Sequence, residues 1–318
     1  MSRVLVTGCS GFLASHLLPR LLAAGTNQVF GITEVPGFTY ADVEVFQVDI
    51  RRRLDIAQML EIIRPDVTYH LAAVANVGFT WKNPELTYEV NFMGTSNLLE
   101  ALQASAPDSR LLLMSSAEVY RAVPPGAGGA GSEPFRESSP TAPQSPYALS
   151  KLAMEMLGDL YGRAFAMKAC MVRAFNFTGP GQDRRFVASD FACQVARIER
   201  GEAAPVIRVG NLEAERDFSD VRDVARWLPV IAAGARPGEV VNACSGQVVS
   251  IRRILDILLA AARVPIRVET DPARFRPLDN PALRGDPGRL RARFGLRPEF
   301  ALERTLGDLL EHWRGRTA

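Results

Sequence analysis

The segment SPYALSK, Ser145 to Lys151, places a tyrosine and a lysine four residues apart, which is about one turn of a helix. A lysine ammonium beside a phenol stabilises the phenolate, so the pKa of Tyr147 is expected to lie below its ordinary value of about 10. Tyr147 is then a candidate general acid and base. The chain contains only three lysines, which makes Lys151 informative. The alternative is an ordinary Tyr/Lys pair on a solvated helix.

A glycine-rich turn opens the chain. The stretch TGCSGFLASH follows a predicted strand and begins a predicted helix, and two of its glycines stand where the backbone has to turn tightly and approach a pyrophosphate. The amino end of the helix then faces the anion. In this strand–turn–helix context, the motif favours dinucleotide binding over a merely structural turn. The expected contact residues are Gly8, Ser10, Gly11, Phe12 and Leu13.

Acidic residues end the next two predicted strands. Glu34 lies roughly twenty residues beyond the glycines, where a carboxylate can accept hydrogen bonds from the adenosine ribose and would repel a 2′-phosphate. NAD(H) is therefore favoured and NADP(H) stays possible; the alternative is an exposed loop glutamate. Asp49, next to Ile50, could contact the adenine edge or equally cap a helix. After the fourth strand, small residues let a cofactor lie against the backbone: Leu71, Ala72 and Ala73.

The run SRLLLMSS predicts a strand that ends at Ser115 and Ser116. Ligands of open parallel sheets bind at the carboxyl ends of the strands, so both serines are expected in the same crevice as Tyr147. Ser116 would donate a hydrogen bond to the substrate oxygen, and Ser115 would lie beside the cofactor. Lys151 would also hold the nicotinamide ribose. Together, the glycine turn, the serines and the Tyr/Lys pair indicate a dehydrogenase or reductase; a dinucleotide sensor would need no general acid.

The elements that position these residues follow an alternating pattern. Strands are expected at 3–8, 28–33, 43–49, 66–73, 109–116 and 167–176, with amphipathic helices between most of them. Such alternation implies right-handed βαβ units and a parallel sheet buried on both faces, which is a doubly wound, Rossmann-type α/β fold. We expect a dinucleotide-binding domain at 1–175 and a smaller substrate lobe at 176–318, with return segments to the sheet around 217–245.

The segment 121–143 interrupts this pattern with turn-forming residues. We expect a loop at the carboxyl edge of the sheet, either a plain solvated excursion or a lid.

The composition of the chain indicates which kinds of binding partner are not expected. The net charge is +2, without a basic block, so no nucleic-acid partner is expected. Four widely spaced cysteines lack metal-ligand spacing, which predicts reduced, mostly buried thiols and no metal. Neither a signal-like leader nor an apolar run of membrane-spanning length occurs, so we expect a cytoplasmic protein that does not enter a membrane.

These motifs together resemble the extended short-chain dehydrogenase/reductase family that acts on nucleotide sugars. The patterns TGCSGFLASH, SSAEVY, YALSK, RAFNFTGPGQ and RDFSDVRDV cover nearly the whole chain. The resemblance implies that Ser116 is the substrate-oxygen donor, that Asn176 contacts the sugar phosphate, and that Arg216 binds the diphosphate. It also implies dimer contacts through the helices around residues 84–104 and 145–165, and hence a homodimer.

Within that family, the second half is most similar to the GDP-4-keto-6-deoxymannose reductases. The carrying stretches are FVASDFACQVARIERGEAAPVIRVGNLEAERDF, VVNACSGQVVSIRRIL and DPARFRPLDNPALRGDPGRL. The similarity implies a GDP-linked 6-deoxyhexose substrate and adds Arg276 as a second phosphate ligand, because arginine can bind a diphosphate through two hydrogen bonds. Val187 and Asp279 complete the predicted substrate set.

Glu118 is the one departure. It occupies the place where dehydratases of this family carry a base for water elimination, yet FNFTGPGQ reads as in the reductases. The resemblance therefore implies NAD(P)H-dependent reduction of the C4 ketone, giving GDP-rhamnose or GDP-6-deoxy-talose. The alternatives are a GDP-mannose 4,6-dehydratase, a nucleotide-sugar C4 epimerase, or a dinucleotide-sensing Rossmann protein.

Overall fold

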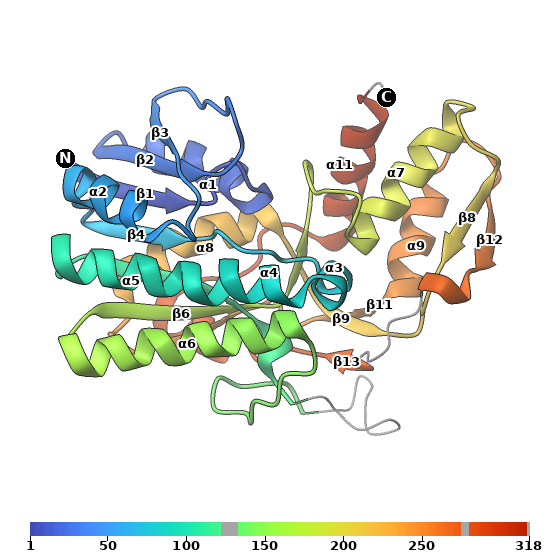
Figure 1. Cartoon of the computed structure of the whole chain (residues 1–318). Coiled ribbons are helices and arrows are strands. Elements are labelled where there is room, and N and C mark those ends of the chain that lie inside the picture. Colours follow the sequence, from blue (N-terminus) through green and yellow to red (C-terminus); the bar gives the residue numbers. More distant parts are fainter. Residues whose placement is uncertain (122–132, 275–279, 317–318) are drawn as a thin grey trace.

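The central feature of the molecule is a seven-stranded sheet (Figure 1). The computed structural model describes residues 1–121, 133–274 and 280–316. The strand order is β10-β6-β5-β4-β1-β2-β3, and every neighbouring pair is parallel. The strands are β1 (Ser2–Thr7), β2 (Asn27–Thr33), β3 (Val43–Gln47), β4 (Val67–His70), β5 (Arg110–Ser116), β6 (Lys168–Ala174) and β10 (Val240–Ala243). The sheet reverses its order beside β1, so the predicted doubly wound α/β class is confirmed.

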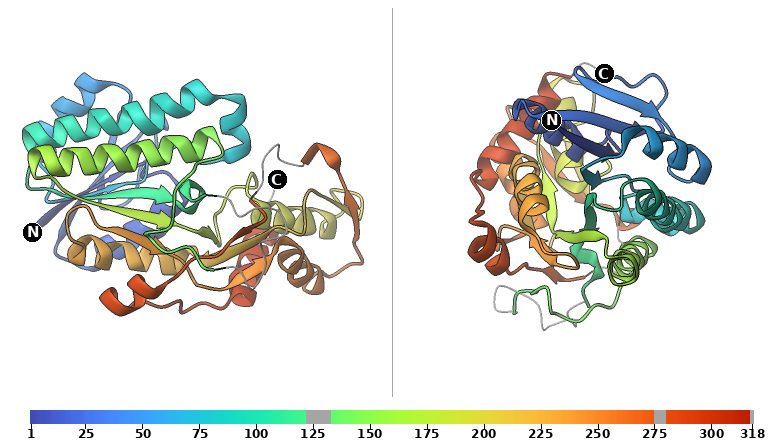
Figure 2. Two further views of the ribbon diagram at one scale, coloured as in Figure 1. Left: turned by 90° about the horizontal axis from the view of Figure 1, so that it is seen from below. Right: turned by 90° about the vertical axis from the view of Figure 1, so that its left-hand side faces the viewer.

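Helices cover both faces of this sheet, because its strands are apolar on both sides. On one face, α1 (Phe12–Ala23) and α8 (Val221–Gly234) pack in one buried apolar core. On the other face, α2 (Arg53–Ile63), α5 (Gly94–Ser105) and α6 (Pro146–Phe165) pack in a second core. Figure 2 shows α5 and α6 side by side on their face of the sheet.

Local signals explain where α6 begins. Ser145 has extended backbone angles, and its side chain accepts a hydrogen bond from the Ala148 amide at 3.1 Å. Pro146 occupies the first turn, where its missing N–H is not needed. Tyr147 and Lys151 therefore lie in the first two turns of the helix, at the end near the carboxyl edge of β5.

The remaining strands form a second layer beside the large sheet. In this smaller sheet, β9 (Glu215–Asp220) pairs with β7 (Asn176–Thr178), β11 (Val248–Ser250) and β13 (Ala282–Leu283). A separate two-stranded sheet contains β8 (Val206–Val209) and β12 (Arg267–Thr270). A third apolar core joins α7 (Val187–Glu199), α9 (Ile251–Ala260) and α11 (Leu302–Arg314), which lie together on one side of the molecule in Figure 1.

Short elements complete the described chain. They are α3 (Val77–Lys82), α4 (Pro84–Tyr88), the π-helical turn η1 (Glu89–Met93), the 3-10 turns η2 (Ala117–Val119) and η3 (Pro272–Arg274), and α10 (Gly288–Phe294). The single helix expected up to residue 104 is thus divided, because the backbone of Asn83 leaves the helical region and Pro84 starts a new helix.

The strand expected at 167–176 is also divided. It leaves the large sheet after Ala174, and the chain enters the smaller sheet at Asn176. The chain returns to the large sheet through α8 and β10. The division into domains at residue 175 stays a prediction.

Two further observations concern the sequence expectations. Among the described helices, none is long and apolar enough to cross a membrane. All four cysteines are buried and free, as expected.

Candidate active site

The glycine turn between β1 and α1 has the shape that a dinucleotide requires. Gly8 has a φ of +68°, and a Cβ on it would lie 2.8 Å from both the amide nitrogen and the Cα of Ala72. Only glycine fits at this position. Gly11 is exposed and caps α1 without a side chain, so no side-chain hydrogen bond occupies the amino end of this twelve-residue helix. These residues fit a bound pyrophosphate.

The end of β2 is attached to this turn. The Cys9 amide donates to the Ile32 carbonyl at 3.0 Å, and the hydroxyls of Ser10 and Thr33 are 2.7 Å apart. Glu34 follows directly and is exposed. The predicted ribose acceptor therefore lies at the strand end that contacts the glycine turn, and its role stays a prediction.

Asp49 lies in a turn two residues after β3. Its carboxylate accepts from the Arg51 amide at 2.9 Å and pairs with the Arg51 guanidinium at 2.7 Å. That hydrogen bond with the Arg51 side chain is the main reason why the pKa of Asp49 is lowered. The helix-capping alternative is wrong, because α2 is capped by Arg52 without a side-chain hydrogen bond. Contact of Asp49 or the buried Ile50 with adenine stays a prediction.

A buried hydrogen-bonded chain, which the sequence did not indicate, holds the glycine turn against the end of β4. Thr7 Oγ1 lies 2.8 Å from His70 Nδ1 and accepts from the Ala72 amide at 3.2 Å. His70 Nε2 lies 2.9 Å from Thr95 Oγ1. Burial lowers the pKa of His70 to about 3, so the ring is neutral. The partly buried residues 71–73 are thereby held next to Gly8, where the cofactor backbone contacts were expected.

Ser116, Tyr147 and Lys151 meet at the carboxyl end of β5. Ser116 and Lys151 are buried, and Tyr147 is partly buried. The Ser116 side chain is hydrogen-bonded to Tyr147 and accepts from the Glu118 amide at 3.2 Å. Lys151 Nζ donates to the Met114 carbonyl at 2.6 Å. The three residue types that the chemistry needs are therefore brought to one strand end.

The expectation that Lys151 lowers the pKa of Tyr147 is wrong. Burial raises the pKa of Tyr147 to about 12; the hydrogen bond with Ser116 opposes this rise and the charge of Glu118 adds to it. The Lys151 ammonium donates to a carbonyl of β5 instead. Tyr147 is consequently a neutral phenol at physiological pH, which is the form a proton donor needs.

Ser115 and Glu118 flank this group. The Ser115 hydroxyl donates to a carboxylate oxygen of Glu155, beneath the site, so a contact of Ser115 with a cofactor would come from its backbone. Glu118 lies in η2, is partly buried, and acts on Tyr147 through its charge.

Two of the predicted substrate residues, Asn176 and Arg216, lie on the smaller sheet. Asn176 begins β7 and pairs with Phe218 of β9, two residues from Arg216. Arg216 is buried between β11 and β13, and one of its guanidinium nitrogens donates to the Glu215 carbonyl at 2.8 Å. Val187 starts α7. Two further calls, Arg276 and Asp279, lie outside the described residues.

Asp217 anchors β9 beside Arg216 and was not singled out by sequence. Its buried carboxylate accepts from the Ser245 amide at 2.9 Å, the Ser245 hydroxyl at 2.6 Å and the Gly246 amide at 2.8 Å. Burial raises its pKa to about 6 despite these donors. The RDF pattern in the sequence could have indicated a charged pair, but alternation in a strand places the two side chains on opposite faces.

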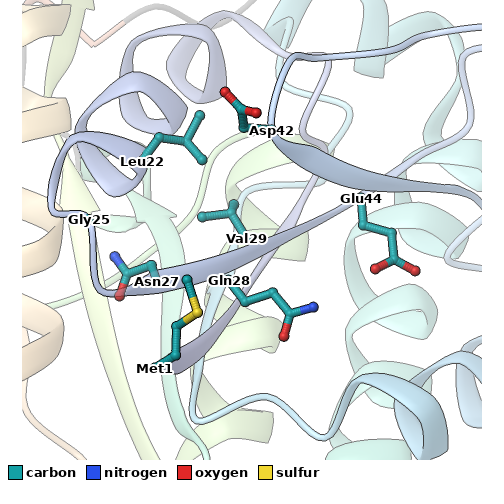
Figure 3. A pocket seen from close by; sticks show the side chains of 8 residues that line it. All are labelled: Met1, Leu22, Gly25, Asn27, Gln28, Val29, Asp42 and Glu44. Carbon is teal, nitrogen blue, oxygen red and sulfur yellow. The ribbon is translucent and has the colours of Figure 1, made fainter.

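A separate hollow lies at the other end of the sheet (Figure 3). Its lining includes Met1, Asn27 and Asp42, which precede or begin β1, β2 and β3. The candidate site is at the opposite, carboxyl ends of these strands, so this hollow is not part of it.

A doubly wound sheet with this glycine turn and a Ser, Tyr, Lys group defines a pyridine-nucleotide enzyme of the extended short-chain dehydrogenase/reductase type. The chain belongs to the GDP-mannose 4,6 dehydratase family, whose model matches residues 5–309.

Individual relatives narrow the comparison. The GDP-6-deoxy-D-mannose reductase of Pseudomonas aeruginosa is 34% identical over 315 residues, covering 99% of this chain and 98% of that protein. A GDP-mannose 4,6-dehydratase of Yersinia enterocolitica is 26% identical, covering 98% and 93%.

Solved structures agree with this assignment. The structure of RMD from Pseudomonas aeruginosa complexed with NADPH matches with a TM-score of 0.86 at 30% identity and covers both chains fully. A Thermus thermophilus UDP-glucose 4-epimerase in complex with NAD matches with a TM-score of 0.87 at 30% identity, covering 99% of this chain and 100% of the other. Neighbours thus bind either nucleotide, and a pyridine nucleotide is the cofactor of this enzyme class.

Proposed function

We propose that this enzyme reduces the C4 ketone of a GDP-4-keto-6-deoxyhexose and forms GDP-rhamnose or GDP-6-deoxy-talose. The observation that carries this proposal is the 34% identity with a GDP-6-deoxy-D-mannose reductase over 99% of the chain. The dehydratases are less similar, at 25–27% identity.

The site geometry supports proton transfer to a ketone oxygen. A bound nicotinamide would supply the hydride. Tyr147 keeps its proton at neutral pH because its pKa is raised, and it can release that proton as negative charge grows on the oxygen. Ser116, already hydrogen-bonded to Tyr147, would place its hydroxyl against the same oxygen. Lys151 would bind the ribose of the nicotinamide through hydrogen bonds from its ammonium group.

The substrate handle is proposed to be GDP. Arg216 and Asn176 lie on neighbouring strands of one sheet, and an arginine fork can bind a diphosphate through two charge-assisted hydrogen bonds. Val187, at the start of α7, belongs to the same proposed subsite.

Product analysis tests the proposal directly. The purified protein is incubated with GDP-4-keto-6-deoxymannose and NADH or NADPH, and the products are identified by NMR. We expect oxidation of the nucleotide and a GDP-6-deoxyhexose with a hydroxyl at C4; its configuration distinguishes the two products. Recovery of the unchanged ketone with both nucleotides would contradict the proposal.

A 4,6-dehydratase is the second candidate, and Glu118 is the observation that favours it. Its carboxylate is partly buried and acts on Tyr147. Incubation with GDP-mannose decides between the two. We expect no 4-keto-6-deoxy product from GDP-mannose, and little effect of Glu118→Gln on ketone reduction. Water release from GDP-mannose that Glu118→Gln abolishes would identify a dehydratase.

We also propose a homodimer in the cytoplasm. Three large apolar side chains of α6 are exposed along one face, Leu149, Met156 and Leu160, at 49%, 66% and 49%. Met93 of η1, a turn that packs on α6, is exposed as well. A second copy would cover this face. Sedimentation should show a dimer that Met156→Glu/Leu160→Glu converts to a monomer; a monomeric wild type would refute it.

A further inference from the structure

Behind the proposed proton donor lies a buried carboxylate that the mechanism above does not use. Glu155 stands one helical turn beyond Lys151 on α6, and the two side chains are 5% and 3% exposed. They contact successive residues of β5: Lys151 donates to the Met114 carbonyl at 2.6 Å, and the Ser115 hydroxyl donates to Glu155. The side chains of Lys151 and Glu155 therefore both contact the end of β5 that carries Ser116.

Arg173 on β6 completes the environment of this carboxylate. Its Nε lies 3.0 and 3.2 Å from the two carboxylate oxygens of Glu155, and its Nη2 lies 2.7 Å from one of them. Both side chains are less than one tenth exposed. The guanidinium also donates to the Glu137 carbonyl at 3.1 Å and lies over the Tyr120 ring at 4.8 Å. Such a fork-like, fully enclosed pair fixes the carboxylate in place.

The charge of the Glu155 carboxylate affects the protonation of Lys151. Burial lowers the pKa of Lys151 to about 8, and the charge of Glu155 opposes this decrease. His70 on β4, which the charge of Lys151 also affects, is neutral near pH 7 because burial lowers its pKa to about 3. Arg173 carries a positive charge, which can only disfavour a second cation nearby. Glu155 thus favours the ammonium through its charge, in addition to the hydrogen bond with the Met114 carbonyl.

We propose that Glu155 is a positioning residue for the proton-transfer site: its carboxylate keeps Lys151 in the ammonium form and holds Ser115, the residue before Ser116, at the end of β5. This inference rests on the proposed function only in assigning Lys151 and Ser116 to ketone reduction. The effect of Glu155 on Lys151 itself requires neither substrate nor cofactor.

The scarcity of lysines makes a direct measurement possible. Protein labelled with ¹³C at lysine Cε contains three such carbons, and the Lys151 resonance is the one that Lys151→Arg removes. Its chemical shift, followed against pH without ligands, reports the protonation midpoint of Lys151. We expect a wild-type midpoint near 8. Glu155→Gln should lower it by about one pH unit or more, since an adjacent opposite charge shifts a pKa by this amount.

Two further variants separate charge from folding. Glu155→Gln leaves Arg173 buried without its partner, which destabilises a protein more than removing both charges does. The double variant Glu155→Gln/Arg173→Met removes both charges, and its midpoint should lie below the wild-type value but above that of the single variant. The matched control is Asp159→Asn, which breaks the exposed Arg163–Asp159 pair on the same helix and should leave the midpoint unchanged.

The outcomes are distinct. Unchanged midpoints in both the single and the double variant would overturn the proposal, and so would failure of both variants to fold, which would make the pair a folding determinant only. The single-turnover rate of ketone reduction with NAD(P)H is then measured against pH. In Glu155→Gln, the decrease in this rate at alkaline pH should move to lower pH by the same amount as the protonation midpoint of Lys151. If the wild type reduces no ketone, the proposed function fails, while the NMR titration still decides the role of Glu155.

Discussion

Thr7 Oγ1 and His70 Nδ1 lie 2.8 Å apart in the interior, and the proton between them can be assigned. Thr95 uses its hydroxyl hydrogen to donate to the Asn91 carbonyl at 2.6 Å, so His70 Nε2 must donate to Thr95. Nδ1 then accepts from Thr7, whose oxygen accepts from the Ala72 amide. With a neutral imidazole, each side chain in this hydrogen-bonded series, Thr7, His70 and Thr95, has a hydrogen-bond partner. A buried neutral histidine is therefore stable at this position.

This assignment predicts a pH effect on stability. Because the pKa of His70 is about 3 in the folded state and about 6.5 in the unfolded state, the unfolded state binds a proton first as the pH falls. The contribution of neutral His70 to the free energy of unfolding is fully present above pH 6.5 and is lost as the pH decreases toward 3. Between pH 7 and pH 5, His70 should lower the free energy of unfolding by about 2 kcal/mol.

Urea unfolding of wild type and His70→Leu at both pH values measures this contribution. The variant should be less stable at pH 7 by about 1–3 kcal/mol, because the Thr7 hydroxyl loses its buried acceptor. It should also lose less stability on acidification than the wild type does. Equal decreases in the free energy of unfolding of the two proteins between pH 7 and pH 5 would contradict a lowered pKa of His70 in the folded state.

Replacement of Tyr147 by phenylalanine tests the proton donor. Tyr147→Phe should keep the fold and the affinity for the nucleotide, and should lower kcat for ketone reduction by about a hundredfold or more. The phenol contributes only as charge develops on the substrate oxygen, so binding is little affected. Steady-state rates and fluorescence titration with NADH provide the two readouts. A near-native kcat would end the proposed mechanism.

Arg216 should act on the GDP-sugar alone. Arg216→Ala is expected to weaken GDP-sugar binding by at least about 1.5–3 kcal/mol, the range for hydrogen bonds to charged groups, and to leave NADH affinity unchanged. Arg252→Ala is the matched control, because that arginine is exposed in the same lobe and pairs with Glu213. Calorimetric titration with GDP and with NADH distinguishes the two sites. Equal loss of both affinities would make Arg216 structural.

Glu34 should set the choice of cofactor. Its exposed carboxylate follows β2 beside the glycine turn and would face a 2′-phosphate unfavourably. An exposed like-charge contact is worth only about 1 kcal/mol, so we expect a several-fold to tenfold preference for NADH over NADPH in kcat/KM. Glu34→Arg should shift this ratio toward NADPH. An unchanged ratio would place the 2′ position away from Glu34.

The class of fold and the motif residues could be predicted from the amino-acid sequence. Apolar runs of strand length, separated by amphipathic helices, leave few arrangements other than a parallel sheet covered on both faces. Gly8 could be assigned from its place between strand and helix, and the structure gives the reason, since a side chain there would strike Ala72. Tyr147 and Lys151 could be paired because a helix has a known period.

The pKa shifts and ion pairs of the site could not be predicted in this way, because charges interact through space and not along the chain. Spacing alone suggested that Lys151 lowers the pKa of Tyr147, whereas packing turns the ammonium toward the Met114 carbonyl and burial raises that pKa. Arg173 and Glu155 come from different elements, and their fully enclosed contact exists only after β6 packs beside α6. A buried ion pair depends on the distance and desolvation of both partners, and neither quantity can be read from sequence separation.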